Sequence, residues 1–178
     1  MSRDLAKPLG DPPVRDRRHP VTAVVALGAN LGDRSGTLDA AVRELERLPL
    51  TERVVCSAPV ETIAVKPEGP DETAPAYLNA VALVTTRLAP TVLLGFLQAI
   101  EERHGRVRRE RWGDRTLDLD LIAYGDVVSD DPALTLPHPR AGERAFVLAP
   151  WLDVDPEAVL PGRGRADALL AALGEEPR

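Results

Sequence analysis

The sequence predicts an α+β fold: a ferredoxin-like βαββαβ core with a mainly antiparallel sheet, helices packed on it, and C-terminal additions. The prediction rests first on the order of the periodic segments, which read strand, helix, strand, strand, helix, strand. A parallel sheet would instead show repeated strand–helix–strand units. It rests secondly on length, because 178 residues without internal repeats suit one domain with a substantial core.

Composition restricts the classes of protein to consider. The net charge of −6 argues against a general nucleic-acid binder, which is normally basic. Cys56 is the only cysteine, so an internal disulfide is excluded and a reducing compartment is expected. No signal peptide and no long apolar segment stands out, so we expect a cytoplasmic protein without a membrane span.

The first half of the domain begins after a proline-rich, charged segment. Residues 1–20 have no apolar period and are expected to form a disordered tail before a single domain at 21–178. Valine-rich residues 21–27 predict a first strand, and helical spacing of apolar residues over 34–48 predicts the first helix. Residues 53–59 predict a second strand.

The middle of the chain holds an irregular segment and then a regular pair of elements. Residues 61–75 contain three prolines and predict a long loop, of the kind that often forms a functional lid. A strand is expected over 77–86, with Tyr77 and Asn79 on one face. Pro90 suits the first turn of a helix that runs to about residue 104.

The fourth strand is the chemically distinctive element. From residue 117 leucine and aspartate alternate, so Leu117, Leu119 and Leu121 should share one face while Asp118 and Asp120 share the other. After it, short extended segments, including 134–137, precede an apolar segment at 144–152 and a terminal helix at 167–173.

Two carboxylates on one face repel each other unless a cation lies between them, and oxygen ligands suit Mg²⁺. The preceding residues 105–115 carry five arginines around Trp112, which suits a polyphosphate. Each half alone has an ordinary explanation, as a solvated sheet face or a solvated loop. Because the arginine-rich segment leads directly into the strand with the two aspartates, a site for magnesium and a nucleotide is a better interpretation than two separate solvated segments.

Familiar nucleotide motifs are missing. The sequence has no GxxxxGK[ST] loop, and residues 28–32 lack the GxGxxG spacing. Tyr77 and Asn79 would suit a flat heterocycle, although an aromatic residue and an asparagine at a strand end are equally common without a ligand. His138 lies between two prolines, and Arg140 and Arg144 nearby suit a second anion contact.

Four segments make the chain resemble the hydroxymethyldihydropterin pyrophosphokinase family. They are GANLGDR (28–34), YLNAV (77–81), GRVRRERWGDRTLDLDLIAYGD (105–126) and LPHPRAGERAFVLAPW (136–151). The third contains the family's RWG-x-R-x-x-D-x-D signature. The resemblance implies transfer of the diphosphate of ATP to a pterin alcohol, with release of AMP, in folate biosynthesis.

The resemblance also implies site residues. Two Mg²⁺ ions would bind Asp118 and Asp120, and these two residues with Arg106 and Arg115 would form the catalytic set. The ATP-binding residues would be Gln98, Glu101, Arg108, Arg111, Trp112, Arg115, His138 and Arg144, with backbone near Leu121, Leu134 and Thr135. The pterin-binding residues would be Gly28, Thr62, Val65, Tyr77, Asn79 and Phe146. We expect a monomer acting on small molecules, without nucleic acid.

One departure from the family concerns the segment after the second strand. The family usually has an E-T-x-P-x-G turn, whereas here Glu61 and Thr62 are followed by a displaced proline, Pro67. Backbone contacts to the pterin near Val65 are therefore open. Two other functions are alternatives: a nucleotidyltransferase, which attacks the α-phosphorus and releases pyrophosphate, and an RNA-binding module. Aromatic residues at 3% and a negative net charge disfavour the RNA-binding module.

Overall fold

The computed structural model describes residues 19–66, 69–71, 75–105 and 116–175. The main sheet has the order β2-β6-β1-β7, and all of its strand pairs are antiparallel. Its strands and the helices between them are β1 (Val21–Ala29), α1 (Arg34–Glu46), β2 (Thr51–Cys56), β6 (Tyr77–Thr86), α2 (Pro90–Arg103) and β7 (Asp118–Tyr124). The expectation of a mixed α and β fold on an antiparallel sheet is confirmed.

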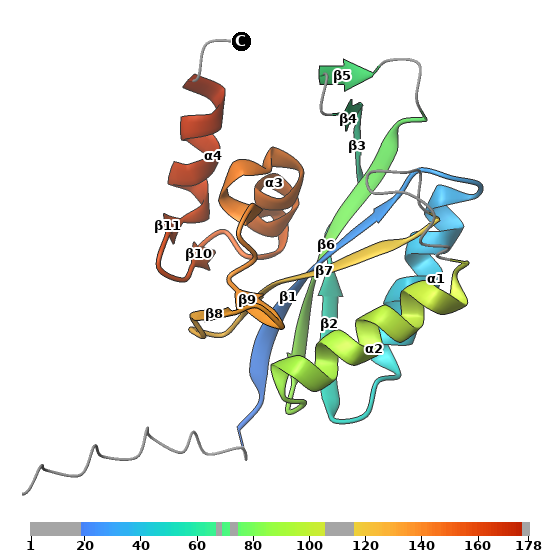
Figure 1. Cartoon of the computed structure of the whole chain (residues 1–178), viewed down its shortest axis with the longest axis vertical. Coiled ribbons are helices and arrows are strands. Elements are labelled where there is room, and N and C mark those ends of the chain that lie inside the picture. Colours follow the sequence, from blue (N-terminus) through green and yellow to red (C-terminus); the bar gives the residue numbers. More distant parts are fainter. Residues whose placement is uncertain (1–18, 67–68, 72–74, 106–115, 176–178) are drawn as a thin grey trace, which may run out of the picture.

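Helices cover both faces of this sheet (Figure 1). On one face, side chains of α1 and α2 such as Leu45 and Leu97 pack with Leu27 and Leu119 of the sheet. On the other face, α3 (Ala145–Val154) and α4 (Ala166–Glu175) form a second core cluster. Since both faces are covered, the central strand β1 is apolar along most of its length. Its sequence does not alternate between apolar and polar residues.

The segment expected to be one long loop contains short strands, which corrects that expectation. β3 (Val60–Thr62) pairs with β6, and β4 (Ala64–Lys66) pairs with β5 (Gly69–Asp71) in a separate two-stranded sheet. Pro70 lies opposite Val65 in that small sheet. A proline is tolerated there because in a two-stranded ribbon its missing N–H can face away from the partner.

Several further element boundaries differ from the expected ones. β1 continues to Ala29, because Gly28 pairs on both sides with neighbouring strands. The second strand begins and ends earlier than expected, at Thr51 and Cys56. The last helix, expected from residue 167, begins at Ala166. The predicted tail lies outside the described residues except for its last two positions.

After β7 the chain forms small elements that lead to the last two helices. They are β8 (Ser129–Asp131), β9 (Leu134–Leu136), a 3₁₀ turn at Ala141–Glu143, β10 (Val159–Leu160) and β11 (Gly164–Arg165). The peptide bond between Leu136 and Pro137 is cis. Among the described residues, no helix combines the length and apolar character needed to cross a membrane.

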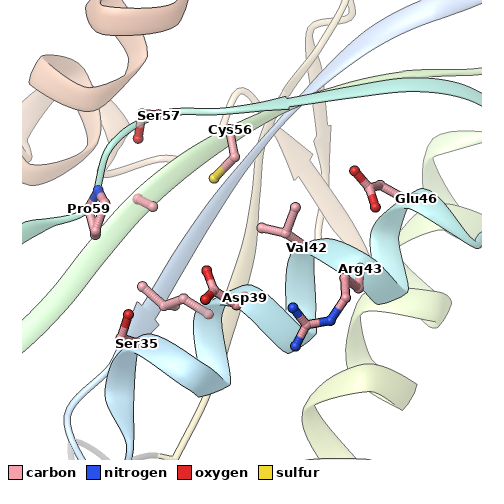
Figure 2. Close-up of a pocket in the computed structure, with 10 residues that line it drawn as sticks. Ser35, Asp39, Val42, Arg43, Glu46, Cys56, Ser57 and Pro59 are labelled. Carbon is pink, nitrogen blue, oxygen red and sulfur yellow. The ribbon is translucent and has the colours of Figure 1, made fainter.

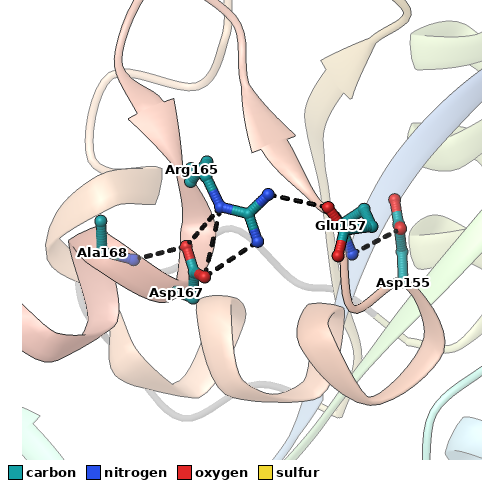
Figure 3. Close-up of polar contacts among 5 residues, drawn as sticks. All are labelled: Asp155, Glu157, Arg165, Asp167 and Ala168. Carbon is teal, nitrogen blue, oxygen red and sulfur yellow. Dashed lines mark hydrogen bonds and ion pairs between the residues drawn. The ribbon is translucent and has the colours of Figure 1, made fainter.

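An exposed ion-pair cluster joins β11 to the start of α4 (Figure 3). The Arg165 guanidinium donates to Asp167 Oδ2 at 2.9 Å and to Glu157 Oε2 at 2.8 Å. The hydrogen bonding between Arg165 and Asp167 holds the pKa of Asp167 below its ordinary range, and the backbone N–H of Ala168 lowers it further. Because the cluster is exposed to solvent, it contributes little to stability.

Candidate active site

Gly28 lies between two of the residues expected to bind ligands. In the sheet register it pairs with Asn79 of β6 on one side and with Asp118 of β7 on the other. Directly paired residues of antiparallel strands point to the same face. Asn79, Gly28 and Asp118 therefore form one row across three strands, on the face covered further along by α3.

The lack of a side chain at Gly28 leaves space on the Asn79 side of this row. A Cβ atom at Gly28 would lie 3.2 Å from Asn79 Oδ1 and 4.0 Å from Tyr77 Cδ1. Asn79 Nδ2 donates a hydrogen bond to Thr62 Oγ1 at 2.7 Å, and Thr62 pairs with Tyr77 across β3 and β6. The structure thus brings together four of the residues expected to contact the pterin.

The leucine and aspartate alternation in β7 has the predicted effect. Leu117, Leu119 and Leu121 are buried in the core beneath α1 and α2. Asp118 and Asp120 are half-buried and belong to the opposite face, on which Asp120 pairs with Ala26. Arg144 Nη1 lies 3.2 Å from Asp120 Oδ2 and forms an ion pair with it.

His138 is held beside β7 through its backbone. Its N–H donates to the carbonyl of Ile122 at 2.8 Å, and its Nδ1 accepts a hydrogen bond from Arg140 N at 3.2 Å. Burial lowers the pKa of His138, and the charges of Arg144 and Arg140 lower it further against the opposing effect of Asp120. A neutral imidazole in this arrangement carries its proton on Nε2, where it can donate to a phosphate oxygen.

Arg144 and Phe146 lie next to each other at the start of α3. Arg144 is the residue before α3, and its Cζ lies 5.6 Å from the centroid of the Phe146 ring. Phe146 is half-buried against the core cluster beneath α3 and α4. One short segment therefore supplies both a cation beside Asp120 and an aromatic ring.

The residues expected on the nucleotide side differ in how far they are buried. Gln98 is exposed on α2, whereas Glu101 is buried and only 2% exposed. Leu121 and the partly buried Leu134 belong to one core cluster, and Thr135 Oγ1 donates to the carbonyl of Asp131. The Glu101 carboxylate accepts a hydrogen bond from Leu119 N at 2.8 Å.

Several expected residues lie outside the part of the chain that the structure describes. Five of them belong to the arginine-rich segment: Arg106, Arg108, Arg111, Trp112 and Arg115. Val65 belongs to β4 by its backbone, and its side chain is likewise not described. The side chains of these six residues are not described, and like the other site assignments these six remain predictions.

The side chains that could bind magnesium supply some, but not all, of the ligands that the ion needs. Within the described residues no group of three or more His, Cys, Asp or Glu side chains forms a metal site. Asp118 and Asp120 supply carboxylate oxygens from one face of one strand. Mg²⁺ is commonly bound by one or two carboxylates, with water and substrate phosphates as its other ligands. The two aspartates match that pattern for a metal that arrives with a nucleotide.

A separate cavity of about 250 Å³ lies between α1 and β2 (Figure 2). Asp39, Val42 and Arg43 of α1 line it on one side, and Cys56 and Ser57 on the other. Burial raises the pKa of the Cys56 thiol, which makes it a weaker nucleophile. Of the residues that the structure describes, none that is predicted to carry chemistry lines this cavity.

Sequence reasoning missed one residue that organises the site. Arg34 Nη1 donates to the carbonyl of Ala76 at 2.6 Å and lies 3.5 Å from Glu61 Oε1. It thereby ties the start of α1 to the junction of β3 and β6, next to Tyr77. The only available signal was its position at the end of the 28–34 segment, and its partners depend on strand pairing that the sequence does not display.

A family model matches the chain. The model described as 7,8-dihydro-6-hydroxymethylpterin-pyrophosphokinase covers residues 24–156. The chain is 42% identical over 141 residues to the 2-amino-4-hydroxy-6-hydroxymethyldihydropteridine pyrophosphokinase of Haemophilus influenzae, covering 79% of this chain and 86% of that protein. It is 45% identical over 148 residues to the enzyme of the same name from Pseudomonas aeruginosa, covering 83% and 89%.

Solved structures support the fold alone. The crystal structure of wild-type Plasmodium falciparum HPPK-DHPS with pteroate matches with a TM-score of 0.66 at 13% identity, covering 86% of this chain. A second structure of HPPK-DHPS, in complex with substrates, matches with a TM-score of 0.62 at 11% identity. The matched region spans 44% and 43% of those longer chains, respectively.

Proposed function

The chain belongs to the 7,8-dihydro-6-hydroxymethylpterin-pyrophosphokinase family, and from that premise we infer its reaction. It transfers the diphosphate of ATP to the hydroxymethyl group of 6-hydroxymethyl-7,8-dihydropterin in folate biosynthesis. The products are the pterin diphosphate and AMP. The hydroxymethyl oxygen forms a bond to the β-phosphorus, the bond from that phosphorus to the oxygen that bridges it to the α-phosphorus breaks, and the hydroxyl proton is lost to solvent.

The observation that carries this proposal is the row formed by Asn79, Gly28 and Asp118. A pterin held on the Asn79 side would meet a nucleotide held on the Asp118 side across one glycine. Holding two reactants in such proximity is itself a large part of catalysis. On the pterin side Tyr77 and Phe146 would stack on the ring, while Gly28, Thr62, Asn79 and the backbone near Val65 would line its edge.

On the nucleotide side, we assign Asp118 and Asp120 to two Mg²⁺ ions, which would neutralise charge on the phosphates. His138 would donate from Nε2 to a phosphate oxygen, and Arg144 would add a two-pronged contact. Arg106 and Arg115 would stabilise the transferred group, with Arg108, Arg111 and Trp112 closing over ATP. Gln98, Glu101 and backbone near Leu121, Leu134 and Thr135 would lie on the nucleotide side. We assign no protein group as general base.

The ferredoxin-like core, the domain bounds, the cellular location and the oligomeric state are also proposals. A ferredoxin-like core is supported by the strand order β2-β6-β1-β7, with α3, α4 and the small sheets as additions to it. We propose one catalytic domain at 21–178 after a disordered tail, acting as a cytoplasmic monomer.

The reaction is tested by ³¹P NMR of the purified protein with ATP, Mg²⁺ and the reduced hydroxymethylpterin. AMP and a pterin diphosphate should appear only when the pterin is present. Release of pyrophosphate would instead indicate attack at the α-phosphorus and a nucleotidyltransferase.

A further inference from the structure

Glu101, assigned above to the nucleotide side, has a carboxylate that is buried within the protein. Glutamate is rarely fully buried, because removing its charge from water is costly unless hydrogen bonds compensate. Glu101 is 2% exposed near the end of α2, among buried neighbours Leu97 and Ile100. Its Oε1 accepts a hydrogen bond from the backbone N–H of Leu119 at 2.8 Å.

Leu119 is the residue between Asp118 and Asp120. Among the strands that the structure describes, β7 is an edge strand of the main sheet and pairs there with β1 alone. An edge strand presents unpaired N–H groups on its outer side, and each such group needs a partner when it is buried. Glu101 supplies that partner at Leu119, and the His138 N–H occupies the Ile122 carbonyl further along. The outer edge of β7 is thus fixed at two points.

We propose that Glu101 is a positioning residue that fixes the backbone between the two aspartates, so that both carboxylates are held for the cation that accompanies the nucleotide. The inference rests on the proposed function, because it concerns how Asp118 and Asp120 are presented. It assigns Glu101 an effect exerted through Leu119 rather than through direct contact with ATP. Groups that orient metal ligands in this way typically alter metal affinity by about 10- to 100-fold when they are removed.

Three variants separate this role from others. Glu101→Leu removes the acceptor at nearly the same volume, and Glu101→Gln removes the charge but keeps an oxygen that can accept from Leu119. Glu102→Leu makes the same change at the exposed neighbouring position of α2 and serves as the control. Binding of Mn²⁺ with a non-cleavable ATP analogue is measured by calorimetry, and binding of the pterin alone is measured in parallel.

Glu101→Leu is expected to weaken Mn²⁺-dependent analogue binding by about 10- to 100-fold, while Glu101→Gln and Glu102→Leu stay near wild type. Pterin affinity should change little in all three variants. Wild-type affinity in Glu101→Leu would overturn the proposal. Equal losses in Glu101→Gln and Glu101→Leu would also overturn it, since the charge itself would then be required, as for a direct ligand.

A measurement on the wild-type protein guards against a variant that does not fold. The Leu119 amide, although on the outer edge of β7, should exchange with solvent as slowly as amides bonded within the sheet. Rapid exchange at Leu119 would contradict the proposal without any reference to activity. The ³¹P NMR assay of the wild-type protein tests the reaction separately, so the two failures are distinguishable.

Discussion

Arg144 and Asp120 form an ion pair with 3.2 Å between Nη1 and Oδ2. Arg144, assigned above to a phosphate contact, is thus paired with Asp120, assigned above to a metal ion. The two side chains are 18% and 34% exposed, so the pair is only partly screened by solvent. Binding of a cation at Asp120 would release the guanidinium, and the released guanidinium would be free to bind the phosphates that arrive with the cation.

This pairing makes a two-part prediction for Arg144→Gln. Without nucleotide, Mn²⁺ should bind more tightly by up to about fivefold, since a pair of this kind contributes up to ~1 kcal/mol. Affinity for ATP with Mg²⁺ should fall by about 10- to 100-fold, the typical loss for a hydrogen bond to a charged group. Arg163→Gln, at an exposed arginine between β10 and β11, is the control for both titrations. If both affinities fell together, the exchange of partners would be refuted.

Asp118→Ala should reduce kcat by on the order of 10³-fold or more, because it removes a proposed metal ligand at a charged transition state. The change is measured in the AMP-release assay at saturating Mg²⁺. Asp126→Ala removes an exposed carboxylate in the turn that follows β7 and should leave kcat unaltered. Near-normal turnover of Asp118→Ala would remove Asp118 from the catalytic set.

Gly28→Ala should weaken pterin binding specifically. The new Cβ would lie 3.2 Å from Asn79 Oδ1, so Asn79 or the ligand must shift. Overpacking of this kind costs about 1–3 kcal/mol, or roughly 5- to 100-fold in affinity for the pterin. ATP affinity should stay within about twofold of wild type, a bound well inside the effect of a single hydrogen bond. Gly95→Ala, whose new Cβ would meet no atom within 4 Å apart from its chain neighbours and its own helix backbone, is the control in calorimetric titrations of both ligands.

The contact between α1 and α2 predicts a pH effect on stability. Burial raises the pKa of Glu44, but hydrogen bonds and charges from Arg103 and His104 outweigh it, so the pKa is lowered overall. A lowered folded-state pKa stabilises the protein above the unfolded value of about 4.3 and loses that contribution as the pH falls through the folded value.

Urea unfolding of wild type and Glu44→Gln should therefore differ near neutral pH and converge in acid. The difference should not exceed ~1 kcal/mol, because the three partners are partly exposed. Glu46→Gln, at an exposed position of the same helix, should show no pH-dependent difference from wild type. A gap that widened on acidification would show that the sign of the Glu44 effect is wrong.

Local periodicity was enough to predict the faces of the strands. Alternation alone placed Leu119 in the core and Asp120 on the opposite face, because successive side chains of a strand point in opposite directions. The same rule assigned Asn79 to the face of Tyr77. Over residues 61–75 the sequence predicts only a loop, because three-residue strands are too short to show a period.

Local periodicity could not predict the contacts between segments that are distant in the sequence. The hydrogen bond from Asn79 to Thr62 requires that β3 pair with β6, and the bond from Leu119 to Glu101 requires that α2 pack beside β7. Arg144 reaches Asp120 only because α3 begins beside the sheet. Residue types and spacing specify which groups are available for chemistry, and the tertiary arrangement decides which of them meet.

The central claim is that pterin and nucleotide bind on either side of Gly28, and paramagnetic broadening tests it most directly. Mn²⁺ and an ATP analogue with a non-cleavable α–β bridge are added to the pterin complex, with Mg²⁺ as the diamagnetic reference. Asn79 and Asp118 are two strand spacings apart, ~10 Å. Pterin protons should therefore broaden far more than the amide of Leu50, which precedes β2 at the opposite end of the sheet. Pterin resonances no broader than that of Leu50 would contradict the claim.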